Sequence, residues 1–383
     1  MDLSRSVDHM PGPISDAEMA ERVRLLQAML ADHDLDGLVC FGAHRDYCPA
    51  DLRYLGRWSC TDEETSYIVV PAEGGTTLIT DAEWDYERAQ VEAYAADVVF
   101  DPSPERALSG LIGRSTPRAR IGISGFRQFP APVYLALGES CPQTSFVDAS
   151  HITESQRRTK SRAELELLAE AARITDAGMQ AGIEAVREGA TESAVAAAAE
   201  YEIRRQGAEL AFVTVMGSGP RTAQATFFPT NRVLQAGDCV VLDCGARVEG
   251  YHGDMCRSLT VGPPSDRQRR ALGAVESAVE NAIEAARPGV SVGDVHRAAR
   301  DAVVRAGFGE HWWGYYMPHG TGAAQHEPPA GMSDEDLLLE QDMVICVEPG
   351  ITLPGEGAFI LEQMVRVTAE GAEALTRLPL RFS

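Results

Sequence analysis

Four acidic residues in the second half of the chain close apolar runs of the kind that form buried strands. Asp243 ends the run that begins at Cys239, Asp254 lies 11 positions later, and Glu348 and Glu362 follow two further apolar runs. A carboxylate buried without a partner costs several kcal/mol, so four such positions need a shared cationic partner. Because hard divalent cations prefer oxygen ligands, this pattern indicates a metal site.

The segment 239–258 carries both aspartates and is predicted to form the centre of that site. It consists of an apolar strand, a glycine-rich turn and a second strand-like segment. A hairpin of this kind aims carboxylates from both arms at one point. Taken alone, the segment fits a solvent-facing hairpin equally well, because Asp and Gly are the commonest turn residues.

Two histidines add a second kind of ligand. His319 and His326 stand 7 positions apart at the ends of the segment His-Gly-Thr-Gly-Ala-Ala-Gln-His. Imidazole is both a common metal ligand and a proton carrier near neutral pH. A lone histidine in a loop is more often a surface or core residue, so the ligand role depends on the four strand-end carboxylates.

Together these positions resemble the pita-bread metallopeptidases. That family includes methionine aminopeptidase, aminopeptidase P and prolidase, and creatinase is a metal-free relative. The shared pattern is an Asp pair 11 apart, an HGxG segment with a second His 7 positions on, Glu348-Pro-Gly and a last acidic residue at Glu362. The resemblance runs from about Ser161 to the C-terminus. It implies an α+β fold, in which a C-terminal pita-bread domain with a duplicated α/β half follows a smaller creatinase-like α/β N-terminal domain.

The resemblance also implies a role for each matching residue. It implies two divalent metal ions, of Mn, Co, Zn or Fe, with Asp254 and Glu362 as bridging ligands. Such a pair lowers the pKa of a bound water towards neutrality. In the family the Glu of the Glu-Pro-Gly segment moves the proton, so Glu348 is the implied general base and acid, and His326 is implied to hydrogen-bond substrate. The implied metal ligands are Asp243, Asp254, His319, Glu348 and Glu362.

Three positions depart from the peptidase pattern. The peptidases carry a histidine three residues before a proline that precedes the first Asp, another four residues before the metal-binding His, and often an arginine two residues before the last Glu. Here these positions hold Thr226, Tyr315 and Ile360. A hydroxyl group cannot replace imidazole as a proton carrier near pH 7. The site is therefore predicted to have lost polar groups.

Aromatic residues gather near the same positions in the sequence. Such clusters pack a core more often than they bind a substrate. Their place beside a predicted ligand nevertheless favours a pocket for an aromatic or otherwise apolar substrate group. The residues predicted to line it are Thr226, Phe227, Trp312, Trp313, Tyr315 and Ile360.

Hydrophobic periodicity predicts two domains, 1–155 and 156–383. In the first, apolar runs alternate with amphipathic stretches, which is typical of an α/β domain with a mixed sheet. In the second, two helix pairs alternate with strand-like segments in a weak internal repeat. The predicted helices are 16–34, 82–94 and 105–112 in the first domain, and one from Ser161 towards 186, one from Thr191, 266–286 and 291–306 in the second. The predicted strands of the first domain are 37–41, 66–70, 76–80, 97–100 and 120–123.

Composition limits the partners and the compartment. A formal net charge of -23 over 383 residues disfavours nucleic acids and anionic membrane surfaces, whose binding depends on Lys and Arg. Neither a membrane span nor a signal peptide is predicted, so a cytoplasmic location is expected. The 8 cysteines contain no Cys-x-x-Cys pair. Cys239, Cys244, Cys256 and Cys346 lie in apolar context near the predicted site, where a free core thiol is favoured over a metal ligand or a nucleophile. The resemblance implies a homodimer.

These observations predict a dinuclear metal-dependent hydrolase that cleaves an amide C–N bond in a small molecule or short peptide, as a variant of the Xaa-Pro peptidases. The alternative is a non-peptidase reaction on the same metal site, either a lyase or a creatinase-like C–N cleavage. A binding module without activity is disfavoured, because such a module has no need for five converging ligands.

Overall fold

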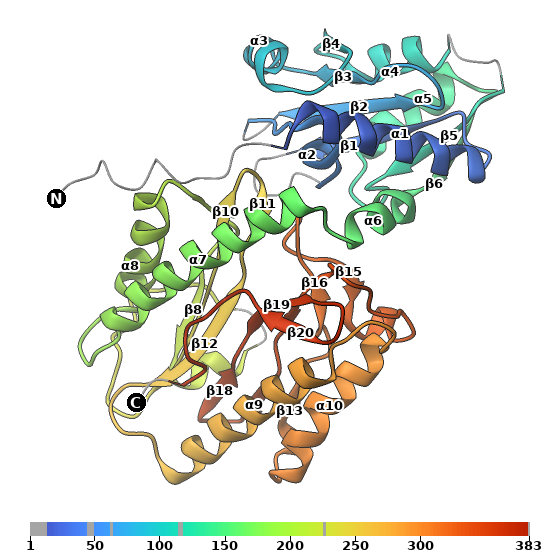
Figure 1. Ribbon diagram of the computed structural model, residues 1–383. Helices are drawn as coiled ribbons and strands as arrows, with labels where there is room; N and C mark the ends of the chain where they lie inside the picture. Colours follow the sequence, from blue (N-terminus) through green and yellow to red (C-terminus); the bar gives the residue numbers. More distant parts are fainter. Residues whose placement is uncertain (1–13, 44–49, 62–63, 114–117, 225–226, 382–383) are drawn as a thin grey trace. The chain divides into compact units, whose positions relative to one another are not determined.

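The computed structural model describes residues 14–43, 50–61, 64–113, 118–224 and 227–381 (Figure 1). These residues divide after Arg157 into two compact units. No helix in the described ranges is both long and apolar enough to cross a bilayer.

The first unit is built on a six-stranded mixed sheet with the strand order β4-β3-β2-β1-β5-β6. Strand β2 pairs antiparallel with both β1 and β3. Strand β4 pairs parallel with β3, β5 with β1, and β6 with β5. The strands are β1 (Gly37–Ala43), β2 (Thr65–Pro71), β3 (Thr77–Thr80), β4 (Asp97–Phe100), β5 (Arg120–Ser124) and β6 (Ser145–Asp148). The helices are α1 (Asp16–Asp32), α2 (Ala50–Gly56), α3 (Glu83–Glu92), α4 (Pro104–Ile112), α5 (Ala131–Ser140) and α6 (Ser150–Arg158).

Strand β1 shows why this sheet is covered on both faces. Successive side chains of a strand point to opposite faces. Leu38 and Cys40 belong to a core with α1, α2 and α3, whereas Val39 and Phe41 belong to a second core with α4 and α5. A continuous apolar run therefore fits the central strand of a three-layer α/β/α domain, which confirms the predicted class of this unit.

The second unit contains two long helix pairs. Helices α7 (Arg162–Ala185) and α8 (Glu192–Arg205) pack together, as do α9 (Asp266–Ala285) and α10 (Val292–Arg305). Ser161 and Ser265 each cap the first helix of a pair in a complete capping box, with Glu164 and Gln268 as the reciprocal partners. Each pair packs against strands of the same unit (Figure 1).

The loops within the two pairs repeat each other in detail. Gly189 and Gly289 have φ values of 84° and 82°, a left-handed conformation that glycine adopts without strain. Their N–H groups donate to Leu234 O at 3.0 Å and to Leu339 O at 2.8 Å. The predicted duplication of an α/β half is therefore present in the backbone, although the residues differ.

The strands of the second unit form four small sheets, ordered β11-β10-β7, β12-β9-β8, β13-β17-β18 and β15-β14-β16-β19-β20. The strands are β7 (Glu209–Leu210), β8 (Val215–Ser218), β9 (Cys239–Cys244), β10 (Ala246–Val248), β11 (Tyr251–His252), β12 (Met255–Thr260), β13 (Trp312–Trp313), β14 (His319–Gly320), β15 (Glu327–Ala330), β16 (Val344–Val347), β17 (Gly350–Leu353), β18 (Gly357–Ile360), β19 (Gln363–Val367) and β20 (Ala372–Ala374). Short 3₁₀ turns occur at η2 (Gly219–Ala223), η3 (Gly309–His311) and η4 (Gly331–Asp334).

The predicted hairpin over 239–258 is present but is divided between two sheets. Strands β9 and β12 pair antiparallel, with Met255 opposite Cys244. The tip, β10 and β11, turns through Glu249 and Gly250, both with positive φ, and joins β7 in another sheet. Positive φ at both central residues is the signature of a type I′ turn, which suits the twist of a hairpin.

Candidate metal centre

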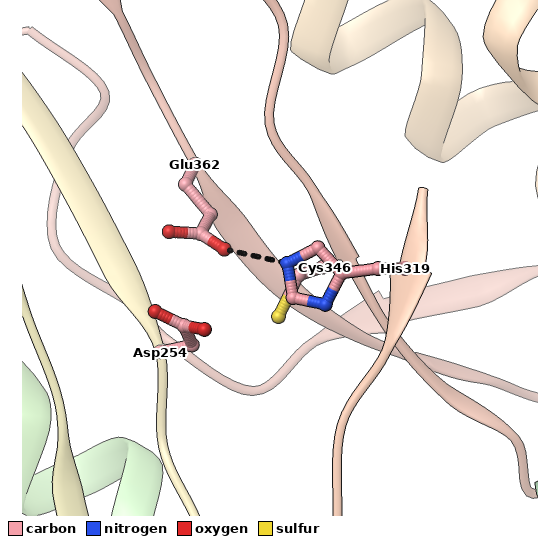
Figure 2. Close-up of side chains that lie close together, drawn as sticks. All are labelled: Asp254, His319, Cys346 and Glu362. Atoms are coloured by element: carbon pink, nitrogen blue, oxygen red, sulfur yellow. Dashed lines mark ion pairs between the residues drawn. The ribbon is translucent and has the colours of Figure 1, made fainter. Parts of the chain in front are cut away.

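Two groups of potential ligand atoms meet in the second unit and share Glu362. In the first group, one atom each from Asp254, His319, Cys346 and Glu362 lies within 4.8 Å of the others. In the second group the same limit holds for Asp243, Glu348 and Glu362. Figure 2 shows the first group, whose side chains converge from separate strands. The structure thus brings together all five residues predicted as metal ligands, and it adds a cysteine.

The two aspartates come from the β9–β12 pair. Asp243 lies within β9, and Asp254 directly precedes β12. Asp243 is opposite Cys256 in the register of the pair, so Asp243 and Asp254 flank the same end of it. The hairpin aims both carboxylates inward because its strands are apolar and buried, and Asp254 itself is only 2% exposed.

The remaining ligands come from the sheet of β14, β16 and β19. His319 on β14 is directly opposite Cys346 on β16. Glu348 directly follows the end of β16, and its carboxylate lies near those of Asp243 and Glu362. Glu362 directly precedes β19 and is 1% exposed.

Arg257 fixes the backbone at Glu362. Its guanidinium group is fully buried and donates to the carbonyl groups of Glu362, Cys256 and Leu378 and to the side chain of Gln363. The N–H of Glu362 also donates to Cys256 O at 3.0 Å. A planar cation with several donors is suited to hold such a cluster of carbonyl groups. Arg257 therefore fixes the backbone of Glu362, which both groups of potential ligands share.

The imidazole of His319 is oriented for ligation through Nε2. Its Nδ1 lies 3.1 Å from Gly320 O, so the proton is assigned to Nδ1 and the lone pair to Nε2. Nε2 lies 3.6 Å from Glu362 Oε1, which is in ion-pair range but long for a hydrogen bond (Figure 2). A metal-binding histidine commonly donates its other N–H to a carbonyl in this way.

Burial and mutual repulsion disfavour the charged forms of the carboxylates. Desolvation raises the pKa of Asp243 well above its ordinary value, and the charges of Asp254, Glu362 and Glu348 raise it further. Desolvation and Glu362 likewise raise the pKa values of Asp254 and Glu348. Burial alone would lower the pKa of His319, but its contact with Glu362 and the nearby charge of Asp254 outweigh burial and raise it. Such a cluster is costly unless cations neutralise it.

The residues fit a divalent cation. Asp243 Oδ1, His319 Nε2 and Glu362 Oε1 are buried and have no hydrogen-bond partner among the described residues. Nearly all buried polar atoms in folded proteins have a hydrogen-bond partner, so three unpartnered atoms at one site require an explanation. All three are lone-pair donors that converge, which is the arrangement that a metal ion satisfies.

His326 lies beside the metal ligands. Its ring centroid is 4.3 Å from that of His319, in an edge-on arrangement. The residue as a whole is exposed, but partial desolvation of its ring, followed by the charges of His319 and His252, lowers the pKa of His326. His326 is therefore a neutral imidazole near pH 7, able to donate or accept a hydrogen bond.

The residues predicted to bind substrate lie in different environments. Thr226 lies outside the described residues. Phe227 and Ile360 are buried in the main core of this unit, at 4% and 8% exposure, and the half-buried Trp312 and Trp313 pack against that core. Tyr315 is 59% exposed and stacks edge-on with Tyr316. Their role in substrate binding stays a prediction.

Several residues at the site were not singled out from the sequence. Gln325 Nε2 lies 3.4 Å from Asp254 Oδ2. Lys160 forms a buried ion pair with Glu327, the neighbour of His326. For Lys160, Arg257 and Glu327 the only signal was a charged residue in or beside an apolar segment. Cys346, by contrast, was noted from the sequence but favoured as a core thiol, and it lies within 4.8 Å of potential ligand atoms of Asp254, His319 and Glu362.

Comparison with known proteins agrees with this geometry. The profile of metallopeptidase family M24 matches residues 166–369, and that of the creatinase/prolidase N-terminal domain matches residues 22–159. An Xaa-Pro dipeptidase of Pyrococcus horikoshii is 30% identical over 81% of this chain and 86% of its own length. A probable dipeptidase, PepE, of Mycobacterium tuberculosis is 31% identical over 95% of this chain and 96% of its own.

Solved structures show the same fold. A prolidase from Thermococcus sibiricus superposes with a TM-score of 0.85 and 26% identity, covering 96% of this chain and 98% of that one. The profile match includes every residue of the two ligand groups, from Asp243 to Glu362. The chain therefore belongs to metallopeptidase family M24, as a metal-dependent hydrolase that carries a creatinase/prolidase N-terminal domain.

Proposed function

We propose that this chain is a dipeptidase-like hydrolase with two divalent cations, and that it cleaves the amide bond of dipeptides or short peptides, including Xaa-Pro peptides. The observation that carries the proposal is the pair of ligand groups that share Glu362. A shared carboxylate between two groups is how a protein holds two cations a few Å apart. We propose that Asp254 is the second carboxylate that bridges the two cations.

Charge balance supports two cations. Asp243, Asp254, Glu348 and Glu362 supply four negative charges when ionised, which neutralise two dications. Cations at this site would lower the pKa of a bound water and polarise the carbonyl of the scissile bond. The ligand types are compatible with Mn, Co, Zn or Fe, and manganese is our first candidate.

The chain's own residues supply proton transfer and orientation. We propose that the Glu348 carboxylate accepts a proton from the attacking water and delivers it to the leaving nitrogen. His326, as a neutral imidazole, would donate a hydrogen bond to the substrate carbonyl oxygen as negative charge develops on it. Its position next to His319 places that hydrogen bond at the metal centre.

We base the proposed substrate preference on the names of the relatives and on the positions where this chain differs from the peptidase pattern. Relatives with most of their length in common are named Xaa-Pro dipeptidase or dipeptidase. Tyr315 occupies a position where the peptidases carry histidine. We propose that this replacement, with the neighbouring Trp312 and Trp313, shifts preference towards substrates with an apolar group.

A second candidate is a non-peptidase C–N cleavage at the same centre. The observation that favours it is Tyr315, which is exposed and cannot carry a proton near pH 7 as imidazole does. Creatinase-like substrates would then be hydrolysed in place of peptides.

One assay separates the candidates. The full chain, loaded separately with Mn, Co or Zn, is incubated with Xaa-Pro dipeptides, dipeptides without proline, Xaa-Pro tripeptides and creatine. Turnover of dipeptides that a chelator abolishes and metal restores supports the peptidase. Absence of peptide turnover in every loaded sample, with turnover of creatine, overturns it in favour of the second candidate.

The assembly and compartment are also proposals. We propose a homodimer in the cytoplasm. All seven described cysteines are free thiols, as expected in a reducing compartment. Light scattering after size-exclusion chromatography would give a mass of twice 41.3 kDa for the dimer, and a single-chain mass would contradict it.

A further inference from the structure

The ligand group around His319 contains a sulfur atom. The thiol of Cys346 is completely buried, and its Sγ lies within 4.8 Å of ligand atoms of Asp254, His319 and Glu362. The second group, Asp243, Glu348 and Glu362, offers only carboxylate oxygens. The two positions for a cation therefore differ in chemistry.

The backbone holds Cys346 in this place. Cys346 is directly opposite His319 in the β14–β16 pair, and opposed residues present their side chains on the same face. Glu348 directly follows β16, and its carboxylate belongs to the second ligand group. Figure 2 shows the sulfur beside the imidazole, on the side from which Asp254 and Glu362 approach. The thiol reaches the ligand group without any change of backbone.

Other buried cysteines of the same unit have a different environment. Cys239 Sγ donates to Ala358 O at 2.6 Å, and Cys256 Sγ lies 4.0 Å from Ile360 O. These thiols behave as small core residues with a carbonyl partner. Cys346 instead lies among carboxylate and imidazole ligand atoms, two of which, His319 Nε2 and Glu362 Oε1, are buried without a hydrogen-bond partner in the described structure.

The distances suit coordination of one ion. Thiolate sulfur binds Zn at about 2.3 Å and imidazole nitrogen at about 2.0–2.1 Å, so these two ligand atoms lie roughly 3.6 Å apart around a tetrahedral ion and at most about 4.5 Å apart on opposite sides of one ion. The atoms of the first group lie within 4.8 Å of one another, so small side-chain movements suffice for them to share one ion. On coordination the S–H bond is replaced by an S–metal bond and the proton is released to solvent, with no change in oxidation state.

We propose that Cys346 coordinates the cation of the first group through its sulfur, so that this position prefers thiophilic ions such as Zn and Co while the all-oxygen position accepts harder ions such as Mn. The inference rests on the proposed two-cation site. Thiolate ligands select softer metals, and carboxylates select harder ones. The centre would then be chemically asymmetric, with one soft and one hard position.

Cobalt absorption tests the sulfur bond directly. The full chain, stripped of metal with a chelator, is titrated with Co(II) under argon. We expect a near-ultraviolet sulfur-to-cobalt charge-transfer band that saturates at one equivalent, together with weak visible bands from both sites. The Cys346→Ser variant is expected to lose the near-ultraviolet band and keep the visible bands.

Cys256→Ser is the matched control, because Cys256 is equally buried and is opposite Asp243 but lies outside both ligand groups. It should keep the near-ultraviolet band. A band that survives in Cys346→Ser and disappears in Cys256→Ser would overturn the inference. So would visible bands without a charge-transfer band in the wild-type chain.

A second measurement needs no variant. X-ray absorption of the Zn-loaded wild-type chain is expected to show sulfur scattering at about 2.3 Å in addition to nitrogen and oxygen. Zinc bound with nitrogen and oxygen scattering alone would overturn the role of Cys346 and leave the two-cation site intact. Failure to bind Co(II) or Zn at all would refute the proposed metal centre itself.

Metal preference gives an independent outcome. In competition titrations the ratio of Zn to Mn affinity at the first position is expected to fall at least about tenfold in Cys346→Ser, the scale of a lost ligand-shell interaction. An unchanged ratio in a folded variant would contradict the proposal.

Discussion

The ammonium group of Lys160 lies 2.5 Å from Glu327 Oε1, in an ion pair whose side chains are 1% and 2% exposed. Glu327 follows His326, and Lys160 lies just before α7, 167 positions away in the sequence. Gly322 lies against the pair, because a Cβ there would clash with Glu327 Oε1. The pair therefore anchors the segment that runs from His319 to His326.

Removing one partner of this pair should destabilise the fold and disturb the site. Lys160→Met removes the cation that is paired with the buried Glu327 carboxylate, and the loss is expected to be about 3–5 kcal/mol in the free energy of unfolding. Urea unfolding of the metal-free chain measures it. We also expect kcat/KM to fall in the metal-loaded protein, because His326 loses its anchor.

Two control variants distinguish the loss of a buried ion pair from the loss of any charged side chain. Lys160→Met/Glu327→Gln removes both charges and should recover more than half of the lost stability. Arg162→Met breaks an exposed pair with Glu166, whose side chains are 93% and 58% exposed, and should change stability by about 0.5 kcal/mol or less. Equal effects of Lys160→Met and Arg162→Met would refute the anchoring role.

The sequence predicted which side chains come together at the site better than it predicted their supports. The four carboxylates were recognised because each adjoins an apolar run, a pattern that depends only on local burial, and His319 was recognised from its HGxG segment. The capping boxes at Ser161 and Ser265 likewise marked helix starts, because cap and partner are three residues apart. Lys160 and Arg257 were not identified, since their partners lie 167 and 105 positions away and no local pattern indicates them.

Helices α2, α5 and α6 and strand β6 of the first unit were not predicted, and two of these elements show why. Helix α2 has seven residues and six of them are buried, so it lacks the alternation of apolar and polar residues that marks an amphipathic helix. Strand β6 contains only Ser145–Asp148 and lies at the edge of the sheet. The division of the 239–258 hairpin between two sheets depends on contacts with β7 and β8, which the hairpin's own residues do not specify.

Stability of the metal-free chain should depend on pH through the carboxylate cluster. The pKa of Asp243 is raised in the folded state by burial and by neighbouring carboxylates. The folded state then binds more protons than the unfolded state, so stability falls as pH rises from the ordinary pKa of Asp through the raised folded value. We expect Asp243→Asn to be more stable than wild type at pH 8, by about 1 kcal/mol or more, and to lose this advantage only as the pH falls to about 4, the ordinary pKa of Asp.

Chelator-treated protein unfolded in urea at both pH values tests this. With metal added the order should reverse at pH 8, because the cations favour the ionised carboxylate. If the metal-free Asp243→Asn variant is less stable than wild type at pH 8, the carboxylates of the cluster do not destabilise the fold by mutual repulsion.

Glu348 should be essential for chemistry beyond its part in metal binding. Glu348→Gln keeps the shape but cannot take up a proton, and kcat is expected to fall by a factor of about 100 to 10,000. Peptidase assays and metal analysis are made on the same samples. Glu340→Gln, on the exposed segment before β16, is the control and should retain wild-type activity. A loss of activity that extra metal fully restores would contradict the proton-transfer role.

Tyr315 should limit peptidase activity. The peptidases carry histidine four residues before the metal-binding His, and an imidazole at that position can share a proton with substrate near pH 7 where a phenol cannot. Tyr315→His is therefore expected to raise kcat/KM for Xaa-Pro dipeptides about tenfold or more, within the range of a gained general acid–base group. The change should be tolerated, because Tyr315 is 59% exposed. Tyr316→His is the matched control, since Tyr316 is 67% exposed and packs edge-on against Tyr315. If both variants match wild type, position 315 does not set the peptidase activity, and the cause of any weak turnover lies elsewhere in the pocket.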